Sequence, residues 1–141
     1  MCFSNNPSVD EFVITGEEFK RIIESAGLQV PVGMFDSTYY YTDGEGWASI
    51  LSHMLFKSNL AKPEKFDCEN YAMKAMSVCH EKYGLNTFGL ALGMTPWGYH
   101  CFNILYDGMG FWLFEPNAQF GYGETLFRIG DNFYQPDRVL V

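Results

Sequence analysis

The spacing of apolar residues changes once along the 141-residue chain, at Gly84, and this change limits the fold more than any other feature. Before Gly84 the spacing is helical and predicts helices over residues 15–27, 43–58 and 68–83. After Gly84, short aromatic and branched runs predict strands at 86–94, 99–106, 111–117, 124–129 and 137–141. We therefore expect one α+β domain, with N-terminal helices packed on a C-terminal antiparallel sheet of four or five strands.

Composition and charge narrow the classes of partner. The chain is 48% apolar, which is enough to fold, and no run of about 18 apolar residues predicts a membrane span. A net charge of −8 disfavours nucleic acid and anionic membranes as partners. The N-terminal residues 1–12 lack the basic start and apolar stretch of a secretion signal. We therefore expect a cytoplasmic protein whose four cysteines are free thiols. The sequence gives no prediction of its oligomeric state.

Cys68 is the first candidate for chemistry. With Asp67 as the N-cap, Cys68 opens the third predicted helix, where free amide groups and the helix dipole favour a thiolate. A thiolate is the reactive form of a cysteine nucleophile. The neighbouring acids Asp67 and Glu69 oppose this charge, so a reactive Cys68 needs a cationic partner. The alternative is a core residue, because Cys79 follows three turns later on nearly the same face.

Among the three histidines, His100 is the best candidate for that partner. His53 and His80 have structural interpretations within helices, whereas His100 follows the turn-rich stretch "TPWGY" and begins a strand. Asp107-Gly108 predicts a two-residue type I′ turn, which would place His100 directly opposite Glu115. A four-residue loop would instead place it opposite Asn117. Both registers put a polar residue on the face of the imidazole.

The stretches "DCENYA", "GYHCFNILYDG" and "FWLFEPN" occur in this order within residues 62–120. Together they resemble the transglutaminase-like branch of the papain-like cysteine protease superfamily. The resemblance implies a transglutaminase-like domain over residues 1–141, with Cys68 as nucleophile, His100 as general base and acid, and Glu115 as the residue that orients His100. Asp is usual at the third position in this branch, and Asn117 is the alternative third residue. CHAP-type amidases show a similar residue order but generally a longer separation between Cys and His.

The resemblance implies a cysteine-dependent hydrolase or transamidase that acts on a peptide or another amide-containing substrate without a cofactor. The Cys68 thiolate would attack an amide carbonyl, His100 would protonate the leaving amine, and water or a second amine would take the acyl group from the thioester. The Cys68 backbone amide would be one donor to the oxyanion. Trp47 and Gln29 are candidates for the second donor, and Trp97 and Tyr99 for walls of the cleft.

Two other interpretations compete with catalysis by cysteine. A zinc site is disfavoured because His100 and Cys101 are adjacent on a strand and point to opposite faces, and because the sequence has no Cys-x-x-Cys motif. We therefore predict no metal. The alternative from another functional class is a binding module, in which a transglutaminase-like fold binds a peptide or small molecule without catalysis.

Overall fold

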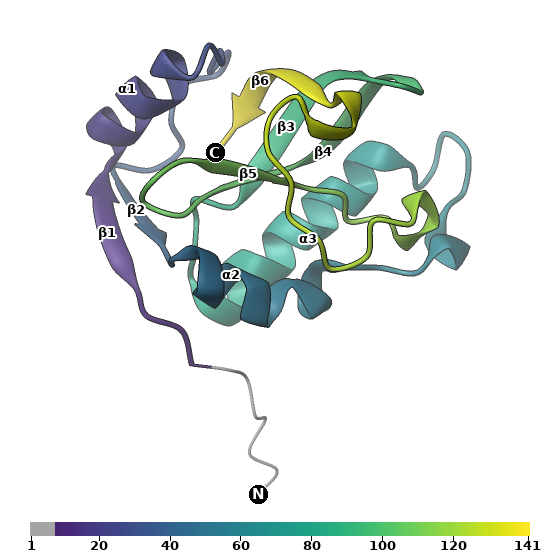
Figure 1. Ribbon diagram of the computed structural model, residues 1–141, viewed down its shortest axis with the longest axis horizontal. Coiled ribbons are helices and arrows are strands. Elements are labelled where there is room, and N and C mark those ends of the chain that lie inside the picture. The colour runs from purple at the N-terminus through teal and green to yellow at the C-terminus, as the bar shows by residue number, and fades with distance from the viewer. Residues whose placement is uncertain (1–7) are drawn as a thin grey trace, which may run out of the picture.

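The computed structural model describes residues 8–141 (Figure 1). Cys2 and most of residues 1–12, for which the sequence analysis expects no secretion signal, lie outside this range. The helices are α1 (Gly16–Ser25), α2 (Gly44–Ile50) and α3 (Cys68–Tyr83). The strands are β1 (Phe12–Thr15), β2 (Thr38–Tyr41), β3 (Gly89–Thr95), β4 (Gly98–Tyr106), β5 (Phe111–Phe114) and β6 (Gln135–Leu140).

The main sheet has four antiparallel strands in the order β5-β4-β3-β6, which confirms the expected α+β class. Helix α3 packs on one face of this sheet, while α1 and the β1–β2 pair cover the other side (Figure 1). Successive side chains of β4 point to opposite faces of the sheet, so β4 contributes core residues to both faces. Phe102 and Ile104 belong to the core shared with Phe19 of α1, whereas Cys101 packs with Ala72 of α3.

Helix α3 begins and ends where the sequence predicts. Cys68 is its first residue, and the backbone amide of Asp67 donates to the side-chain oxygen of Asn70 at 3.1 Å. Gly84 ends the helix with a φ of 65°, a conformation that glycine adopts without the strain of a Cβ atom. Helix α1 is also confirmed, because the Thr15 hydroxyl accepts from the amide of Glu18 at 3.1 Å.

A buried amide fixes α3 against the sheet. The side-chain nitrogen of Asn103, on β4, donates to the carbonyl oxygen of Ala72 at 3.0 Å and to that of Gly89 at 3.0 Å. Asn103 is fully buried, so these hydrogen bonds satisfy a donor that water cannot reach. The strand that carries His100 is thereby tied to the helix that carries Cys68.

Two predicted elements differ from the structure. The helix expected over residues 43–58 stops at Ile50 and continues as a 3₁₀ turn from Leu51 to Met54. The strand expected at 124–129 is wrong, because only Phe127 pairs, with Leu113, before the chain turns away. In addition, β2 pairs with β1, a strand that was not predicted.

The predicted two-residue turn between β4 and β5 is also wrong. The loop has four residues, 107–110, and Tyr106 pairs with Phe111. One carboxylate oxygen of Asp107 accepts from the amides of Met109 at 2.7 Å and Gly110 at 2.8 Å, and the other accepts from the indole of Trp112 at 2.8 Å. These three hydrogen bonds favour the wider loop, because an aspartate that bonds to following amides builds its own turn. The alternative register in the sequence analysis is therefore the observed one.

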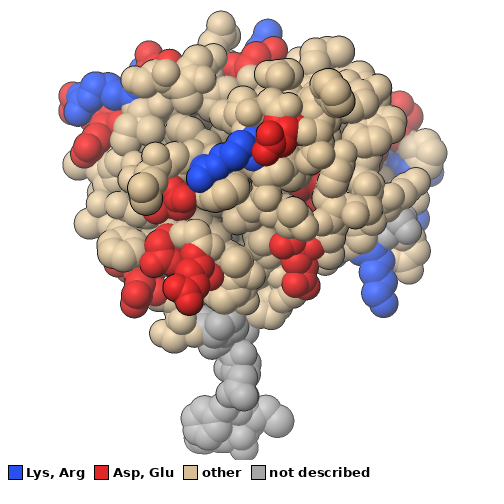
Figure 2. All heavy atoms as spheres, in the orientation of Figure 1, with Lys and Arg blue, Asp and Glu red and all other residues tan. Residues whose placement is uncertain are grey.

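The surface is mainly uncharged, with more acidic than basic side chains on the face in Figure 2, as expected for 17 acidic and nine basic residues. Within residues 8–141, no helix combines the length and apolarity that crossing a membrane requires.

Candidate active site

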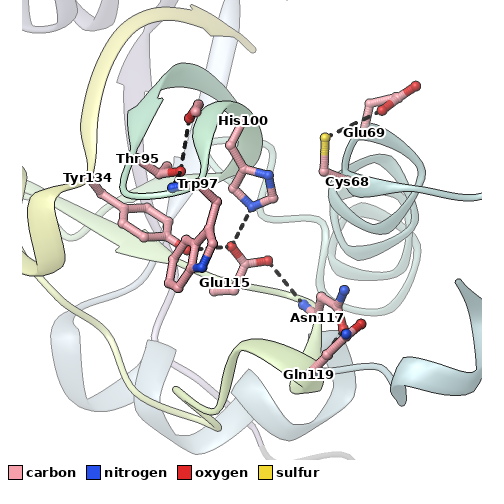
Figure 3. Close-up of polar contacts among 10 residues, drawn as sticks. Cys68, Glu69, Thr95, Trp97, His100, Glu115, Asn117, Gln119 and Tyr134 are labelled. Carbon is pink, nitrogen blue, oxygen red and sulfur yellow. Dashed lines mark hydrogen bonds and ion pairs between the residues drawn. The ribbon is translucent and has the colours of Figure 1, made fainter. Parts of the chain in front are cut away.

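Cys68 and His100 line the same cavity, which has a volume of about 550 Å³. Its walls come from the loop that precedes α3, from the turn between β3 and β4, and from the segment that follows β5. Strand β5 leaves β4 after Phe114, so no strand pairs with β4 on that side at the level of His100. The start of α3 lies near this opening, and there the thiol and the imidazole face each other (Figure 3).

Glu115 holds the imidazole of His100 in place. Its carboxylate oxygen Oε2 lies 2.7 Å from Nε2 of His100, and only 1% of Glu115 is exposed. Burial by itself lowers the pKa of His100, but hydrogen bonds with Cys68 and Glu115, and the charges of both groups, raise it to about 9. A pKa of about 9 favours the imidazolium form of His100 at neutral pH.

The observed register explains why Glu115, and not Asn117, contacts His100. Continued past Phe114, it would place Asn117 directly opposite His100, but the strand ends and Asn117 caps a 3₁₀ turn instead. Glu115 lies two residues earlier and therefore on the same face. Its longer side chain spans the diagonal separation from His100.

Two further donors hold the buried carboxylate. The hydroxyl of Tyr134 donates to Oε2 of Glu115 at 2.9 Å, and the backbone amide of Asn117 donates to Oε1 at 3.3 Å (Figure 3). Tyr134 is fully buried, and burial and the contact with Glu115 raise the pKa of its hydroxyl, which keeps it a donor. The sequence analysis missed Tyr134, because it precedes β6, which pairs with β3 and not with β4.

We expect Tyr134→Phe to lower the free energy of unfolding by about 1.5–3 kcal/mol, the usual contribution of a hydrogen bond to a charged group. The ring would keep its packing against Phe102 and Phe127, so the loss reports the hydroxyl alone. Urea unfolding at neutral pH measures the change. Tyr122→Phe, which removes a hydroxyl from a neighbouring ring, is the control. Equal effects of the two substitutions would contradict a specific role of Tyr134 at Glu115.

Cys68 is half-buried at the start of α3, and its sulfur lies 3.5 Å from a carboxylate oxygen of Glu69. In Figure 3 the free ring nitrogen of His100 is turned toward the same sulfur. A hydrogen bond between the carboxyl groups of Asp67 and Glu69 raises the pKa of Asp67 and lowers that of Glu69.

The other described cysteines have different environments. Cys79 and Cys101 are buried, and burial raises the pKa of both thiols, that of Cys101 to about 12. His100 and Cys101 face opposite sides of β4, in agreement with the alternation expected of a strand. Among residues 8–141, no cluster of three or more His, Cys, Asp or Glu side chains has an arrangement that would hold a metal ion.

The structure places Trp97, a predicted wall of the cleft, and Asn117, the alternative third residue, in the cavity lining. Trp97 is 60% exposed, and its ring contacts Phe120 edge to face with a centroid distance of 4.9 Å. Asn117 is buried, and its side-chain oxygen accepts from the amide of Gln119 at 2.9 Å. The alternative of Asn117 as the partner of His100 is therefore not what the structure shows.

Trp47, Gln29 and Tyr99 lie elsewhere. Trp47 is fully buried, and its indole donates to the carbonyl oxygen of Tyr106 at 2.8 Å, so it has no free donor for a substrate. The backbone of Gln29 pairs with the C-terminal strand, and its side chain lines a separate cavity beside α1. The hydroxyl of Tyr99 donates to Asp137 at 3.0 Å, on the face of β4 opposite to His100.

No protein-family profile matches the sequence, and no curated protein matches it. Among solved structures, the fold is similar to a chain of the "PSL1a-E64 complex", with a TM-score of 0.67 and 19% sequence identity. The similarity covers 92% of this chain and 51% of that chain, so the sequence spans about half the length of the structure that it matches. At this identity the match concerns the fold alone. It confirms the expected α+β fold, with N-terminal helices packed on a C-terminal antiparallel sheet, and does not single out the transglutaminase-like branch.

Proposed function

We propose that the chain is a cysteine-dependent enzyme of acyl transfer that acts on an amide bond, with Cys68, His100 and Glu115 as its triad. The observation that carries this proposal is the cavity in which a cysteine at a helix start faces a histidine anchored by a buried carboxylate. A buried ion pair costs free energy to desolvate, so its position at a cavity wall favours a functional role over a structural one.

The residues support a two-step reaction through a thioester. The Cys68 sulfur forms a bond to the substrate carbonyl carbon, and the electrons of the C=O bond move to the oxygen. When this intermediate collapses, the carbon–nitrogen bond breaks and His100 donates its proton to the leaving amine. His100 then removes a proton from water or a second amine, which attacks the thioester and releases Cys68. Glu115 stays ionised throughout and stabilises the imidazolium.

The order Cys68, His100, Glu115, with an acid in third place, favours the transglutaminase-like branch within the papain-like fold. The matched structure is a complex with E64. By analogy, the aromatic residues and amides that line this cavity suit a peptide or a peptide-like amide as the substrate. If the chemistry has been lost, the same cavity would serve a module that only binds such a ligand.

Thiol labelling tests the proposal. At neutral pH, iodoacetamide should modify Cys68 at least about 100-fold faster than Cys79 or Cys101, because burial raises the pKa of the latter two thiols and shields them. Mass mapping of the labelled peptides over time measures the three rates. A Cys2→Ser background removes the fourth thiol, which lies outside the described residues.

The labelling is followed by an assay with a peptide p-nitroanilide, in which release of the amine reports cleavage of an amide. Cys68→Ala should show no release, and E64 should bind the wild type and not this variant. Equal labelling of the three cysteines, together with no release by the wild type, would contradict the enzyme and favour the binding module.

A further inference from the structure

The proposed reaction needs two donors for the oxyanion, and the structure leaves one of them unassigned. The backbone amide of Cys68 opens α3, where amides have no acceptor within the helix, so it is available as the first donor. The two candidates for the second donor lie elsewhere: Trp47 in the core and Gln29 beside α1. The second donor must therefore come from another segment of the cavity wall.

Asn117 is a polar side chain that is more than nine-tenths buried and yet lines this cavity. It follows β5 by three residues and lies two residues after Glu115, the partner of His100. Among the described residues the oxygen of this side chain has a hydrogen-bond partner, whereas its nitrogen has none and is not fully enclosed, so the nitrogen is open to a ligand in the cavity.

The orientation of the Asn117 amide follows from its neighbours. The backbone amide of Gln119 donates to Oδ1 of Asn117 at 2.9 Å, so Oδ1 is the end that faces the 3₁₀ turn. The NH₂ group must then be the other end. Figure 3 shows it turned up, toward the side of the site on which Cys68 lies. An asparagine has two N–H donors at this end, and both are suited to an anionic oxygen.

The backbone holds Asn117 from both sides. The amide of Phe56 donates to the carbonyl oxygen of Pro116 at 2.8 Å, and the amide of Ala118 donates to the carbonyl oxygen of Phe56 at 2.9 Å. The amide of Asn117 itself donates to Glu115 at 3.3 Å. A donor fixed before the reaction starts stabilises a developing charge without reorganisation, which is the requirement for an oxyanion donor.

We propose that Nδ2 of Asn117 is the second oxyanion donor and therefore a catalytic residue. As the Cys68 sulfur bonds to the carbonyl carbon, the negative charge that forms on the oxygen accepts hydrogen bonds from the Cys68 amide and from Asn117. This inference rests on the proposed function. It gives Asn117 a role different from that of orienting His100, which belongs to Glu115.

The test compares acylation with alkylation of Cys68. p-Nitrophenyl acetate acylates the sulfur through a tetrahedral oxyanion and releases p-nitrophenolate, whereas iodoacetamide alkylates the same sulfur without one. Asn117→Thr keeps a side-chain oxygen that can cap the 3₁₀ turn, but removes the NH₂ group. We expect this variant to lower the acylation rate by about 100-fold and to leave the alkylation rate within about twofold of the wild type.

Two further variants complete the design. Asn117→Asp keeps the shape and the cap and also lacks the donor, so it should acylate at least as slowly as Asn117→Thr. Asn59→Thr, at an exposed asparagine outside the cavity lining, should acylate at the wild-type rate. Circular dichroism confirms that each variant is folded. If Asn117→Thr is folded and acylates within threefold of the wild type, the inference is wrong. If the wild type itself is not acylated, the proposed function fails, and this inference fails with it.

Discussion

The substitution His100→Ala is expected to lower the rate of acyl transfer by on the order of 10³–10⁴-fold. His100 acts at two points of the proposed reaction, first as the cation that holds the Cys68 proton and then as the acid that protonates the leaving amine. General acid–base catalysis alone contributes about 10²–10⁴-fold, and loss of the thiolate adds to this. Alkylation of Cys68 at neutral pH should slow as well, because no other histidine lines the cavity.

Steady-state hydrolysis and iodoacetamide labelling of the same preparation measure the two effects. His80→Ala is the matched control, because the His80 ring hydrogen bonds to the carbonyl oxygen of Phe88 at 2.7 Å and lies outside the cavity lining. Removal of His100 also leaves Glu115 buried without its closest partner, so thermal unfolding must show that the variant is folded at the assay temperature. An active, folded His100→Ala variant would exclude the proposed triad.

The substitution Glu115→Gln should lower the acylation rate at pH 7.5 by on the order of 10²–10³-fold, less than the roughly 10⁴-fold loss that an acid-to-amide change causes in the triad of serine proteases. Glutamine matches glutamate in size and can still accept from Tyr134, but it carries no charge. The charge of Glu115 is one of the causes that raise the pKa of His100 to about 9, so its loss lowers that pKa. A smaller fraction of His100 is then imidazolium at pH 7.5, and it stabilises a thiolate less.

The pH dependence of acylation separates this effect from a loss of structure. In the wild type the rate should fall as the pH rises through about 9, where His100 loses its proton. In Glu115→Gln this fall in rate should occur at lower pH. A variant that is only less stable would show the fall at the same pH as the wild type. Glu124→Gln removes a carboxylate from an exposed position and should change neither the rate nor the profile. An unchanged profile in Glu115→Gln would show that Glu115 does not set the charge of His100.

Local chemistry explains which parts of the fold could be predicted from the sequence. The limits of α3 follow from the cap at Asp67 and from Gly84, and the strands β3, β4 and β6 follow from their apolar residues. The loop between β4 and β5 could not be predicted with certainty, because Asp-Gly suits a two-residue turn. Its actual length depends on the contact between Asp107 and Trp112, a residue five positions away.

The candidate site likewise has parts that could be predicted from the sequence and parts that could not. The pairing of His100 with Glu115 could be anticipated, because two neighbouring strands bring them together and both registers place a polar residue near the imidazole. Tyr134 could not, since it reaches Glu115 from a segment that pairs with neither of those strands. Trp47 and Gln29 were candidates because of their chemistry alone. Their positions depend on packing between distant segments, which the sequence pattern does not encode.

The hydrogen bonds of Asn103 determine which parts of such a chain can accept substitutions during evolution. They join α3 to β3 and β4 inside the core, so the alignment of thiol and imidazole is established when the chain folds and does not await a ligand. The loop before α3 and the turn around Trp97 form the rim of the cavity, and neither takes part in the hydrogen bonds of Asn103. If the proposed function holds, these rim segments can therefore vary to accept new substrates while Cys68 and His100 keep their alignment. A replacement of Asn103, which lies outside the cavity lining, would disturb that alignment for every substrate.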